Sequence, residues 1–251
     1  MHKWTQAEDN LLAQHYQLPK IELAKLFPHR SQAAINIRAS KLGLKKQRNE
    51  YCQSKLDILL DDTHPSYYWM GFILADGSFT KHYRLTVTLA HQDLDHLTKL
   101  AEYLQTTLRV YDKSSYPKAV LSCQDKFVIP KLMSKFDANF SKTYNPPSCL
   151  PSDNELLTSL FIGYCDGDGS LGYQYKRTDC LLRIRVHNNW LCWLLEINQR
   201  LGLSNAQPKL SKDNYAIWNI ANNGVLRKLK RHALKYKLPM LERKWNKLSL
   251  F

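Results

Sequence analysis

The stretch LFIGYCDGDGSL (160–171) decides the fold, because a second stretch of the same pattern, WMGFILADGSF (69–79), stands earlier in the chain. In both, an apolar run typical of a helix ends in Asp-Gly-Ser. After each, alternating polar and apolar residues indicate strands. A pattern that occurs twice in one chain indicates an internal structural repeat. We therefore expect two copies of one unit, each beginning with a helix that ends in an aspartate.

Small residues recur four positions apart near the end of both predicted helices. The pairs are Gly71 with Ala75 and Gly163 with Gly167. Residues at positions i and i+4 lie on one face of a helix, and small residues there allow two backbones to approach closely. The sequence thus predicts that the two helices pack side by side and bring their terminal aspartates together.

The two terminal aspartates, Asp76 and Asp168, occupy electrostatically unfavourable positions. A helix C-terminus carries a partial negative charge, its last carbonyl oxygens lack partners, and two neighbouring carboxylates repel each other. Carboxylates are hard oxygen ligands that suit Mg²⁺ together with phosphate oxygens. The pattern therefore predicts a Mg²⁺ (or Mn²⁺) site of the kind that hydrolyses phosphodiesters.

The helix and strand patterns follow the order αββαββα twice, which gives the fold class α+β. Period-2 alternation, as in LTVTL (85–89) and LRIRV (182–186), predicts strands with one buried and one polar face. We expect the first repeat at 63–145, the second at 146–251 and a polar linker at 47–62 before them.

Residues 1–46 have the pattern of three short helices around a small core. Thr5 and Glu8 form a predicted capping box, Ser31 is a predicted N-cap, Pro19 fits a first helical turn and Gly43 is a predicted helix stop. The expected core residues are Trp4, Leu11, Leu12, Leu23, Ala24, Leu26, Phe27, Ile35 and Leu42.

The start WTxxED and the basic third helix of this segment resemble a Myb/SANT-like helix-turn-helix. In that family the third helix enters the major groove of DNA. A small helical module without DNA contacts is the alternative. The resemblance implies major-groove contacts from Arg30, Ser31, Gln32, Asn36, Arg38 and Lys41.

The net charge of +14 favours nucleic acid as the partner, with an anionic membrane surface as the second candidate. Residues 226–251 alone contain nine Lys or Arg and one acid. The chain has no run of about 18 apolar residues, so we expect no membrane span. Its N-terminus lacks an apolar signal region, and we expect a cytoplasmic protein of a bacterium or phage-infected cell, or one encoded in an organelle.

The motifs WMGFILADG and FIGYCDGDG resemble the paired motifs of LAGLIDADG homing endonucleases, over roughly residues 60–251. The resemblance implies a pseudo-twofold fold with the motif helices at its centre and saddle-shaped antiparallel sheets along the DNA major groove. It implies that Asp76 and Asp168 bind metal ions, assisted by the backbone carbonyls of Ala75 and Gly167. The implied activity is a metal-dependent double-strand break with short 3′ overhangs, made by a monomer on double-stranded DNA.

The sequence departs from this family at one point. The family places a Lys or Gln beside the metal ions to order water, and the strands KAVLSCQ and YAIWNIA carry no lysine at matched positions. Lys118 and His187 are the candidates for this catalytic role. Asp166 also lies in the second motif, but its counterpart in the first is Leu74, so no metal role is predicted for it.

DNA contacts are expected from the polar faces of the two sheets. Arginine binds guanine bidentately in the major groove, and other polar side chains hold phosphates. For each single residue an ordinary surface position is the alternative. The candidates are Ser78, Thr80, Lys81, Arg84, Thr86, Thr88, Ser170, Gln174, Lys176, Arg183 and Arg185.

Two other functions stay open at this point. A DNA-binding regulator would use the same fold without cleavage, although both motif aspartates are present. An RNA-binding intron maturase would also share the fold. A helix-turn-helix favours duplex DNA, because the major groove of RNA is too deep and narrow for a helix.

Overall fold

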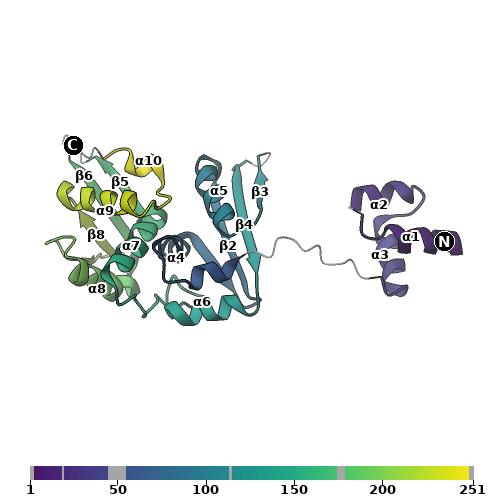
Figure 1. Cartoon of the computed structure of the whole chain (residues 1–251), viewed down its shortest axis with the longest axis horizontal. Coiled ribbons are helices and arrows are strands. Elements are labelled where there is room, and N and C mark those ends of the chain that lie inside the picture. The colour runs from purple at the N-terminus through teal and green to yellow at the C-terminus, as the bar shows by residue number, and fades with distance from the viewer. Residues whose placement is uncertain (1–2, 19, 45–54, 113–114, 174–178, 249–251) are drawn as a thin grey trace. The chain divides into compact units, whose positions relative to one another are not determined.

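The computed structural model describes residues 3–18, 20–44, 55–112, 115–173 and 179–248 (Figure 1). The chain divides into two compact units, Met1–Gln53 and Ser54–Phe251. Each unit has a hydrophobic core of its own. The finer boundaries predicted at residues 46, 62 and 145 stay predictions.

The first unit contains three helices, α1 (Gln6–His15), α2 (Lys20–Leu26) and α3 (Gln32–Lys41). The capping box is confirmed, since the Thr5 side chain accepts from the Glu8 backbone N–H and the Glu8 carboxylate accepts from the Thr5 N–H. Ser31 caps α3 through the N–H of Ala34. Gly43 follows α3 with a φ of +67°, as expected of a helix stop.

The core of the first unit differs in part from the predicted one: Ala39 is buried there without having been predicted, and the predicted Ala24 is only half-buried. Its buried residues are Leu12, Leu23, Phe27, Ile35 and Ala39. Leu26 and Leu42 were expected there but are each 37% exposed. Leu26 is the last residue of α2 and Leu42 is the residue after α3, so both lie where a helix ends and are less covered than residues inside it. Pro19 lies outside the described residues.

The second unit contains the two predicted repeats. The first consists of α4 (His64–Asp76), β1 (Gly77–Thr80), β2 (Arg84–Ala90), the 3₁₀ turn η2 (His91–Asp93), α5 (Leu94–Tyr103), β3 (Leu108–Tyr111), β4 (Lys118–Gln124) and α6 (Val128–Phe136). The second consists of α7 (Asn154–Asp168), β5 (Gly169–Tyr173), β6 (Cys180–His187), the 3₁₀ turn η3 (Asn188–Trp190), α8 (Leu191–Leu201), β7 (Lys209–Leu210), β8 (Tyr215–Ile220) and α9 (Asn223–Lys235).

Each repeat forms one antiparallel four-stranded sheet, in the order β1-β2-β4-β3 or β5-β6-β8-β7. The registers are equivalent as well, since Gly77 pairs with Val87 and Gly169 with Ile184. Figure 1 shows α4 and α7 at the centre of the unit with one sheet on each side. The predicted α+β fold with two αββαββα repeats is therefore confirmed.

The close packing of α4 against α7 is also confirmed. A Cβ added to Gly71 would lie 1.9 Å from the carbonyl oxygen of Leu160, and one added to Gly163 would lie 1.9 Å from that of Tyr68. The two backbones touch at these glycines, and no larger residue fits there. The small residues predicted from the i, i+4 spacing are the ones at the contact.

Two further short elements belong to the second unit besides the αββαββα elements of the repeats. Residues expected in the polar linker form the 3₁₀ turn η1 (Leu56–Leu60), whose Leu56 and Leu59 are fully buried in the core. These two apolar side chains are part of the core of the second unit, so this part of the expected linker packs on the first repeat. The basic tail contains a further short helix, α10 (Glu242–Trp245). Within the described parts of the chain, no helix is both long and apolar enough to cross a membrane.

Candidate active site

The two motif aspartates stand at corresponding helix ends. α4 ends at Asp76 and α7 at Asp168, and the next residue in each case begins a strand. A Cβ added to Gly167 would lie 2.2 Å from the Cβ of Ala75 and 3.3 Å from a carboxylate oxygen of Asp76. The carboxylate of Asp76 thus lies against the last turn of α7. Both aspartates are exposed, so solvent, ions and a ligand reach them.

The surroundings raise the pKa of both carboxyl groups. Although each carboxylate reaches solvent, most of the volume around it is protein, and this loss of hydration raises the pKa of Asp76 from 3.8 to about 6, with repulsion from Asp168 as the second cause. Loss of hydration also raises the pKa of Asp168, against the attraction of Lys142. The site is therefore short of positive charge in the absence of a cation.

Lys142 lies at the end of the first motif helix. Its Nζ donates to the carbonyl oxygens of Leu74 and Ala75, each at 2.6 Å. Burial lowers the pKa of this amine, and the carboxylates of Asp168 and Asp76 oppose the shift. The ammonium group thus neutralises carbonyl oxygens that a helix C-terminus leaves without partners.

Lys244 occupies the corresponding place at the end of the second motif helix. Its Nζ donates to the carbonyl oxygens of Gly169 at 2.6 Å and of Cys165 and Gly167 at 3.2 Å each, and also to that of Asp166. The side chain is buried, which lowers the pKa of the amine, while Asp166 is the main opposing charge. Each aspartate therefore has a lysine beside its helix end, half-buried in the case of Lys142 and buried in the case of Lys244.

Lys118 and His187 do not occupy this place. Gly77, the residue after Asp76, pairs with Val87 of β2, whereas Lys118 pairs with Ala90. Ala90 lies three residues, or about 10 Å, further along β2 than Val87. His187 lies equally far along β6 from the partner of Gly169. Lys118 lies over the ring of Tyr111, and the Nδ1 of His187 accepts from the backbone N–H of Asn189. Their expected water-ordering role has no support in these positions.

A divalent cation fits the donors at the two helix ends. The described residues contain no group of three or more His, Cys, Asp or Glu side chains that could hold a metal ion. Mg²⁺ is commonly held by one or two carboxylates together with substrate phosphates, and Asp76 and Asp168 supply these carboxylates. The carbonyls of Ala75 and Gly167 accept from lysines here, so only their second lone pairs are available to an ion.

The raised pKa of Asp76 makes a prediction for the metal-free protein. A carboxyl group with a higher pKa in the folded state stabilises the fold below pH 4, and this contribution is lost as the pH rises through 6. Asp76→Asn should therefore raise the free energy of unfolding at pH 7.5 by about 1 kcal/mol, a value reduced by solvent screening of an exposed carboxylate. At pH 4 it should change little.

The measurement is urea unfolding of both proteins in EDTA at the two pH values. The exposed Asp57 supplies the control, since Asp57→Asn should alter neither value. A gain of equal size at pH 4 and pH 7.5 would show that the charge of Asp76 is not its cause.

Asp166 is buried and has a structural role. Its carboxylate accepts from the Tyr68 hydroxyl at 2.6 Å, the Trp245 Nε1–H at 2.7 Å and the Leu241 N–H at 3.0 Å. These bonds tie the segment that carries Lys244 to the motif helices. The absence of a predicted metal role for Asp166 agrees with this position.

The exposed faces of the two sheets carry the predicted DNA-contacting residues. Leu85, Val87 and Leu89 are buried, and the residues that alternate with them face outwards. Arg84 donates to the side-chain oxygen of Gln124 at 3.2 Å and Arg183 to that of Asn219 at 3.2 Å. The other expected residues that are exposed or half-buried at the surface are Ser78, Thr80, Lys81, Thr86, Thr88, Ser170 and Arg185.

Several further polar residues share these faces and were not predicted. Ser122 and Gln124 are exposed on β4, and Asn219 is half-buried on β8. The alternation in KAVLSCQ and YAIWNIA was the available signal. The predicted contacts Gln174 and Lys176 lie outside the described residues.

Arg30, just before α3, and Arg38 within it form ion pairs inside the first unit. Arg30 forms an ion pair with Glu8 at 2.9 Å and lies over the ring of Trp4, and its side chain is only 14% exposed. Arg38 forms a two-pronged ion pair with Asp9. These ion pairs hold the start and the middle of the α3 segment against α1, so both guanidinium groups are occupied by carboxylates in this structure.

The remaining predicted residues of α3 are available at the surface. Gln32 donates to the Asn36 side chain at 3.1 Å across one turn. Gln32, Asn36 and Lys41 lie at the solvent-facing side of the helix with Ile37, which is 59% exposed. α3 has no acidic residue, and the acids of α1 are paired with Arg30 and Arg38.

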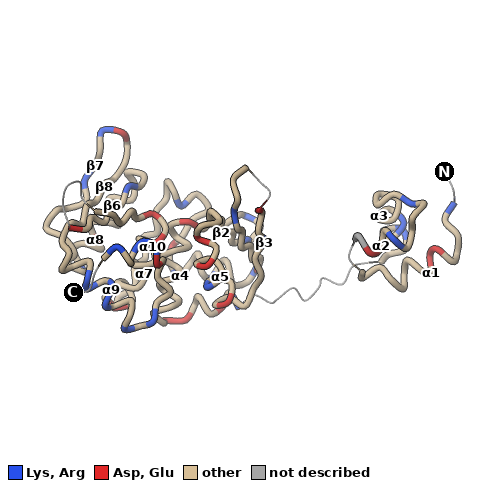
Figure 2. The backbone as a smooth tube through the Cα atoms, turned by 90° about the horizontal axis from the view of Figure 1, so that it is seen from above, with Lys and Arg blue, Asp and Glu red and all other residues tan. Residues whose placement is uncertain are grey.

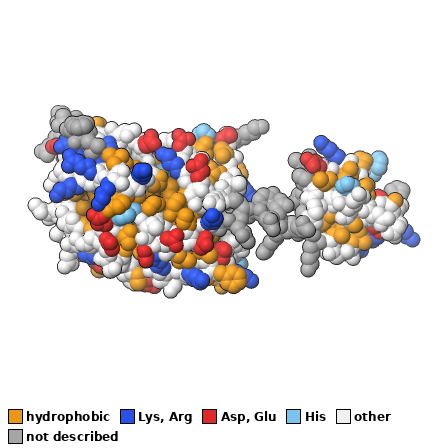
Figure 3. Space-filling model, in the orientation of Figure 1, with side chains coloured by type: hydrophobic (Ala, Val, Ile, Leu, Met, Phe, Trp, Pro, Cys, Tyr) orange, Lys and Arg blue, Asp and Glu red, His pale blue; other side chains and the backbone are white. Residues whose placement is uncertain are grey.

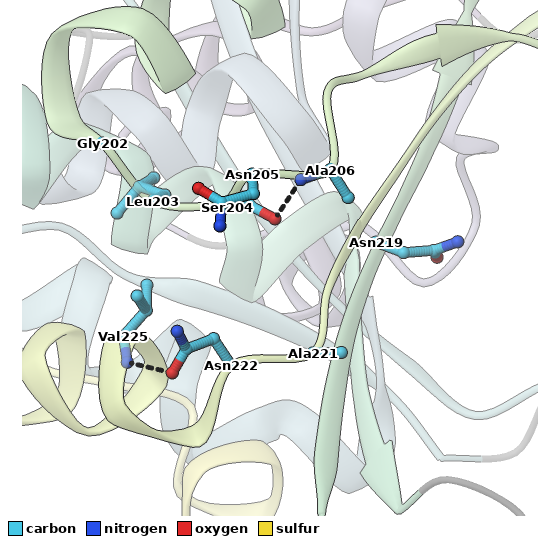
Figure 4. A pocket seen from close by; sticks show the side chains of 9 residues that line it. All are labelled: Gly202, Leu203, Ser204, Asn205, Ala206, Asn219, Ala221, Asn222 and Val225. Atoms are coloured by element: carbon cyan, nitrogen blue, oxygen red, sulfur yellow. Dashed lines mark hydrogen bonds between the residues drawn. The ribbon is translucent and has the colours of Figure 1, made fainter.

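The charged side chains do not gather on the face seen in Figure 3, where acidic and basic groups are interspersed over the second unit. Figure 2 likewise shows red and blue positions side by side around α10. A hollow of about 340 Å³ lies between α9 and the segment after α8 (Figure 4). Its lining contains Ser204, Asn205, Asn219 and Asn222 and no charged side chain, so it offers no acid or base.

Comparison with solved structures shows which known fold the second unit shares. No protein-family profile matches the sequence, and no curated protein matches it. The structure is similar to the LAGLIDADG homing endonuclease I-LtrWI bound to its target DNA, with 12% identity, 72% of this chain and 87% of that chain covered and a TM-score of 0.51. It is also similar to the LAGLIDADG meganuclease I-CpaMI bound to uncleaved DNA, with 11% identity, 70% and 86% covered and a TM-score of 0.50. At these identities the likeness establishes the fold.

Proposed function

We propose that this chain is a sequence-specific DNA endonuclease that makes a double-strand break with short 3′ overhangs, using Mg²⁺ or Mn²⁺. The observation that carries the proposal is the meeting of Asp76 and Asp168 where α4 and α7 touch. Two exposed carboxylates at one point, each with a lysine beside its helix end, suit a phosphodiester and a divalent cation. The two solved structures named above are DNA-bound nucleases, which supports this reading.

The chemistry follows from the residues at the helix ends. A divalent cation held by Asp76, Asp168 and phosphate oxygens would supply charge stabilisation and a more acidic water. Lys142 and Lys244 add positive charge beside the negative helix ends, which lowers the repulsion between the carboxylates and a phosphate. Each repeat thus provides one aspartate and one lysine, enough for one strand. Because both repeats are in one chain, we propose that it acts as a monomer.

Recognition is assigned to the exposed sheet faces. Arg84, Arg183 and Arg185 are the candidates for guanine, and the hydroxyl groups and Lys81 are candidates for phosphates and other base edges. On α3, Gln32 and Asn36 suit adenine and the exposed Ile37 suits the methyl group of thymine. We propose that the first unit lengthens the target through this helix.

The test is a cleavage assay of the full chain on a randomised duplex DNA library, with Mg²⁺ and with EDTA. A break at one long site that requires Mg²⁺ is expected. Binding of a selected duplex without any break would indicate a DNA-binding regulator instead. Retention of structured RNA in preference to duplex DNA would indicate a maturase.

The role of the first unit has its own prediction. Deleting residues 1–46 should weaken binding to the selected duplex by about tenfold or more, since it removes a separate set of contacts. Cleavage should continue at the same bonds, because both aspartates are in the other unit. Gel-shift titration and nuclease footprinting measure the two effects. An unchanged affinity and footprint would exclude a DNA contact from the first unit.

A further inference from the structure

The segment that carries Lys244 is held by the opposite repeat. Arg243, the preceding residue, makes a two-pronged ion pair with Asp93 of η2, one arm of it 2.7 Å long. Glu242 accepts from Lys99 of α5 at 2.9 Å, and the carbonyl of Pro239 accepts from the Tyr68 hydroxyl of α4 at 3.1 Å. Asp93, Lys99 and Tyr68 all belong to the first repeat, whereas Lys244 caps the helix of the second.

The segment that carries Lys142 shows the reverse arrangement. The carbonyl of Thr143, the next residue, accepts from the Nε1–H of Trp190 at 3.1 Å. The carbonyl of Tyr144 accepts from the side-chain amide of Asn189 at 2.5 Å. Asn189 and Trp190 form η3 of the second repeat, whereas Lys142 caps the helix of the first.

The two anchors are equivalent positions of the repeat. η2 follows β2 and η3 follows β6, and each is a three-residue turn before the next helix. Asp93 and Trp190 are both the last residue of their turn. Each repeat therefore uses the same turn to hold the neighbour of the lysine at the other repeat's helix end. Asp166 adds an anchor for Lys244 from its own repeat, so the contacts from the first repeat are not its sole support.

We propose that the repeats position each other's lysines, with Asp93 and Arg243 as positioning residues for Lys244 and Asn189 as the positioning residue for Lys142. We call each set of contacts from one repeat to the lysine segment of the other a crossed anchor. One consequence rests on the proposed nuclease function, namely that each crossed anchor controls cleavage of one DNA strand. A loosened lysine no longer holds its charge beside its aspartate, and small misplacements at a reacting centre cost about tenfold to a hundredfold in rate.

The first measurement needs neither DNA nor metal. Lysine acetylation of the full chain by acetic anhydride is followed residue by residue by mass spectrometry. In Asp93→Asn and in Arg243→Ala, acetylation of Lys244 should rise about fivefold or more, because the segment opens more often, while that of Lys142 stays unchanged. In Asn189→Ala, acetylation of Lys142 should rise by the same factor while that of Lys244 stays unchanged. Arg243→Lys should restore most of the protection of Lys244.

The matched control is Lys99→Ala, which removes the ion pair between Lys99 and Glu242 of the Lys244 segment. Its two side chains are 39% and 72% exposed, so this pair contributes little to holding the segment. Lys99→Ala should leave Lys244 protected within about twofold. A variant that unfolds would expose both lysines together, and Lys142 serves as the internal reference. Equal change at both lysines, or none at Lys244 in both Asp93→Asn and Arg243→Ala, would overturn the proposal.

The second measurement uses the selected duplex with each strand labelled. Asp93→Asn and Arg243→Ala should slow one strand by about tenfold and accumulate a nick, and Asn189→Ala should slow the other. Equal slowing of both strands would overturn the crossed assignment. Should the wild-type chain cleave no duplex, the proposed function fails, and acetylation alone decides whether the anchors hold the lysines.

Discussion

Asp76→Asn and Asp168→Asn should each lower the rate of double-strand cleavage by about a thousandfold or more. Asparagine has nearly the shape of aspartate, so the fold is kept while the charge that holds a divalent cation is lost. A metal ion contributes several kcal/mol to phosphoryl transfer, and about 4 kcal/mol corresponds to a thousandfold in rate. Binding should persist or tighten, because each change removes a negative charge that faces the phosphates.

Single-turnover cleavage and gel-shift titration on the selected duplex measure the two effects. Asp61→Asn, an exposed acid on the second unit and outside both motif helices, is the control and should cleave as the wild type does. Near-normal cleavage by both single variants would rule out the two-carboxylate site. Loss of binding together with cleavage would instead show that the aspartates support the DNA-contacting surface.

Local sequence pattern was enough to predict the central helices and the sheets. The spacing of Gly71 from Ala75 and of Gly163 from Gly167 marks a contact face, and a face depends only on neighbours along one helix. Strand alternation is equally local, so the buried Val87 and Ile184 could be read from their own strands.

The lysines of the site could not be predicted in this way. Lys142 reaches Leu74 from 68 residues along the chain, and Lys244 reaches Asp166 from 78. The two stand in unlike surroundings, SKTY and ERKW, so the repeat gives no shared motif to compare. Lys244 was one positive charge among nine in the tail, and only tertiary contact distinguishes it.

Arg30, just before α3, and Arg38 within it make internal contacts that were not predicted. The Myb/SANT resemblance predicts that Arg30 and Arg38 contact DNA. In the structure they pair with Glu8 and Asp9, which stand together at the start of α1. The adjacent acids of the WTxxED pattern could have indicated these internal ion pairs. A three-helix unit with few core residues is stabilised further by ion pairs between its helices.

Gly163→Ala should destabilise the second unit by roughly 3 kcal/mol or more, enough to cause loss of soluble protein at physiological temperature. The added Cβ would lie 1.9 Å from the carbonyl oxygen of Tyr68 and 3.0 Å from the backbone nitrogen of Phe72. These are backbone atoms inside a helix, so the clash is relieved only by moving α4 away from α7. Such a movement opens voids along the core of both repeats.

Gly172→Ala is the matched control, because nothing lies within 4 Å of a Cβ at that position. It should change stability by less than about 1 kcal/mol, with a small gain from the reduced freedom of the unfolded chain. Urea unfolding followed by tryptophan fluorescence compares the two, since Trp69 and Trp218 are buried in the second unit. Equal stability of the two variants would mean that the helices have room to separate. In that case the contact would not fix the distance between Asp76 and Asp168, so the stability result bears on the site as well as on the fold.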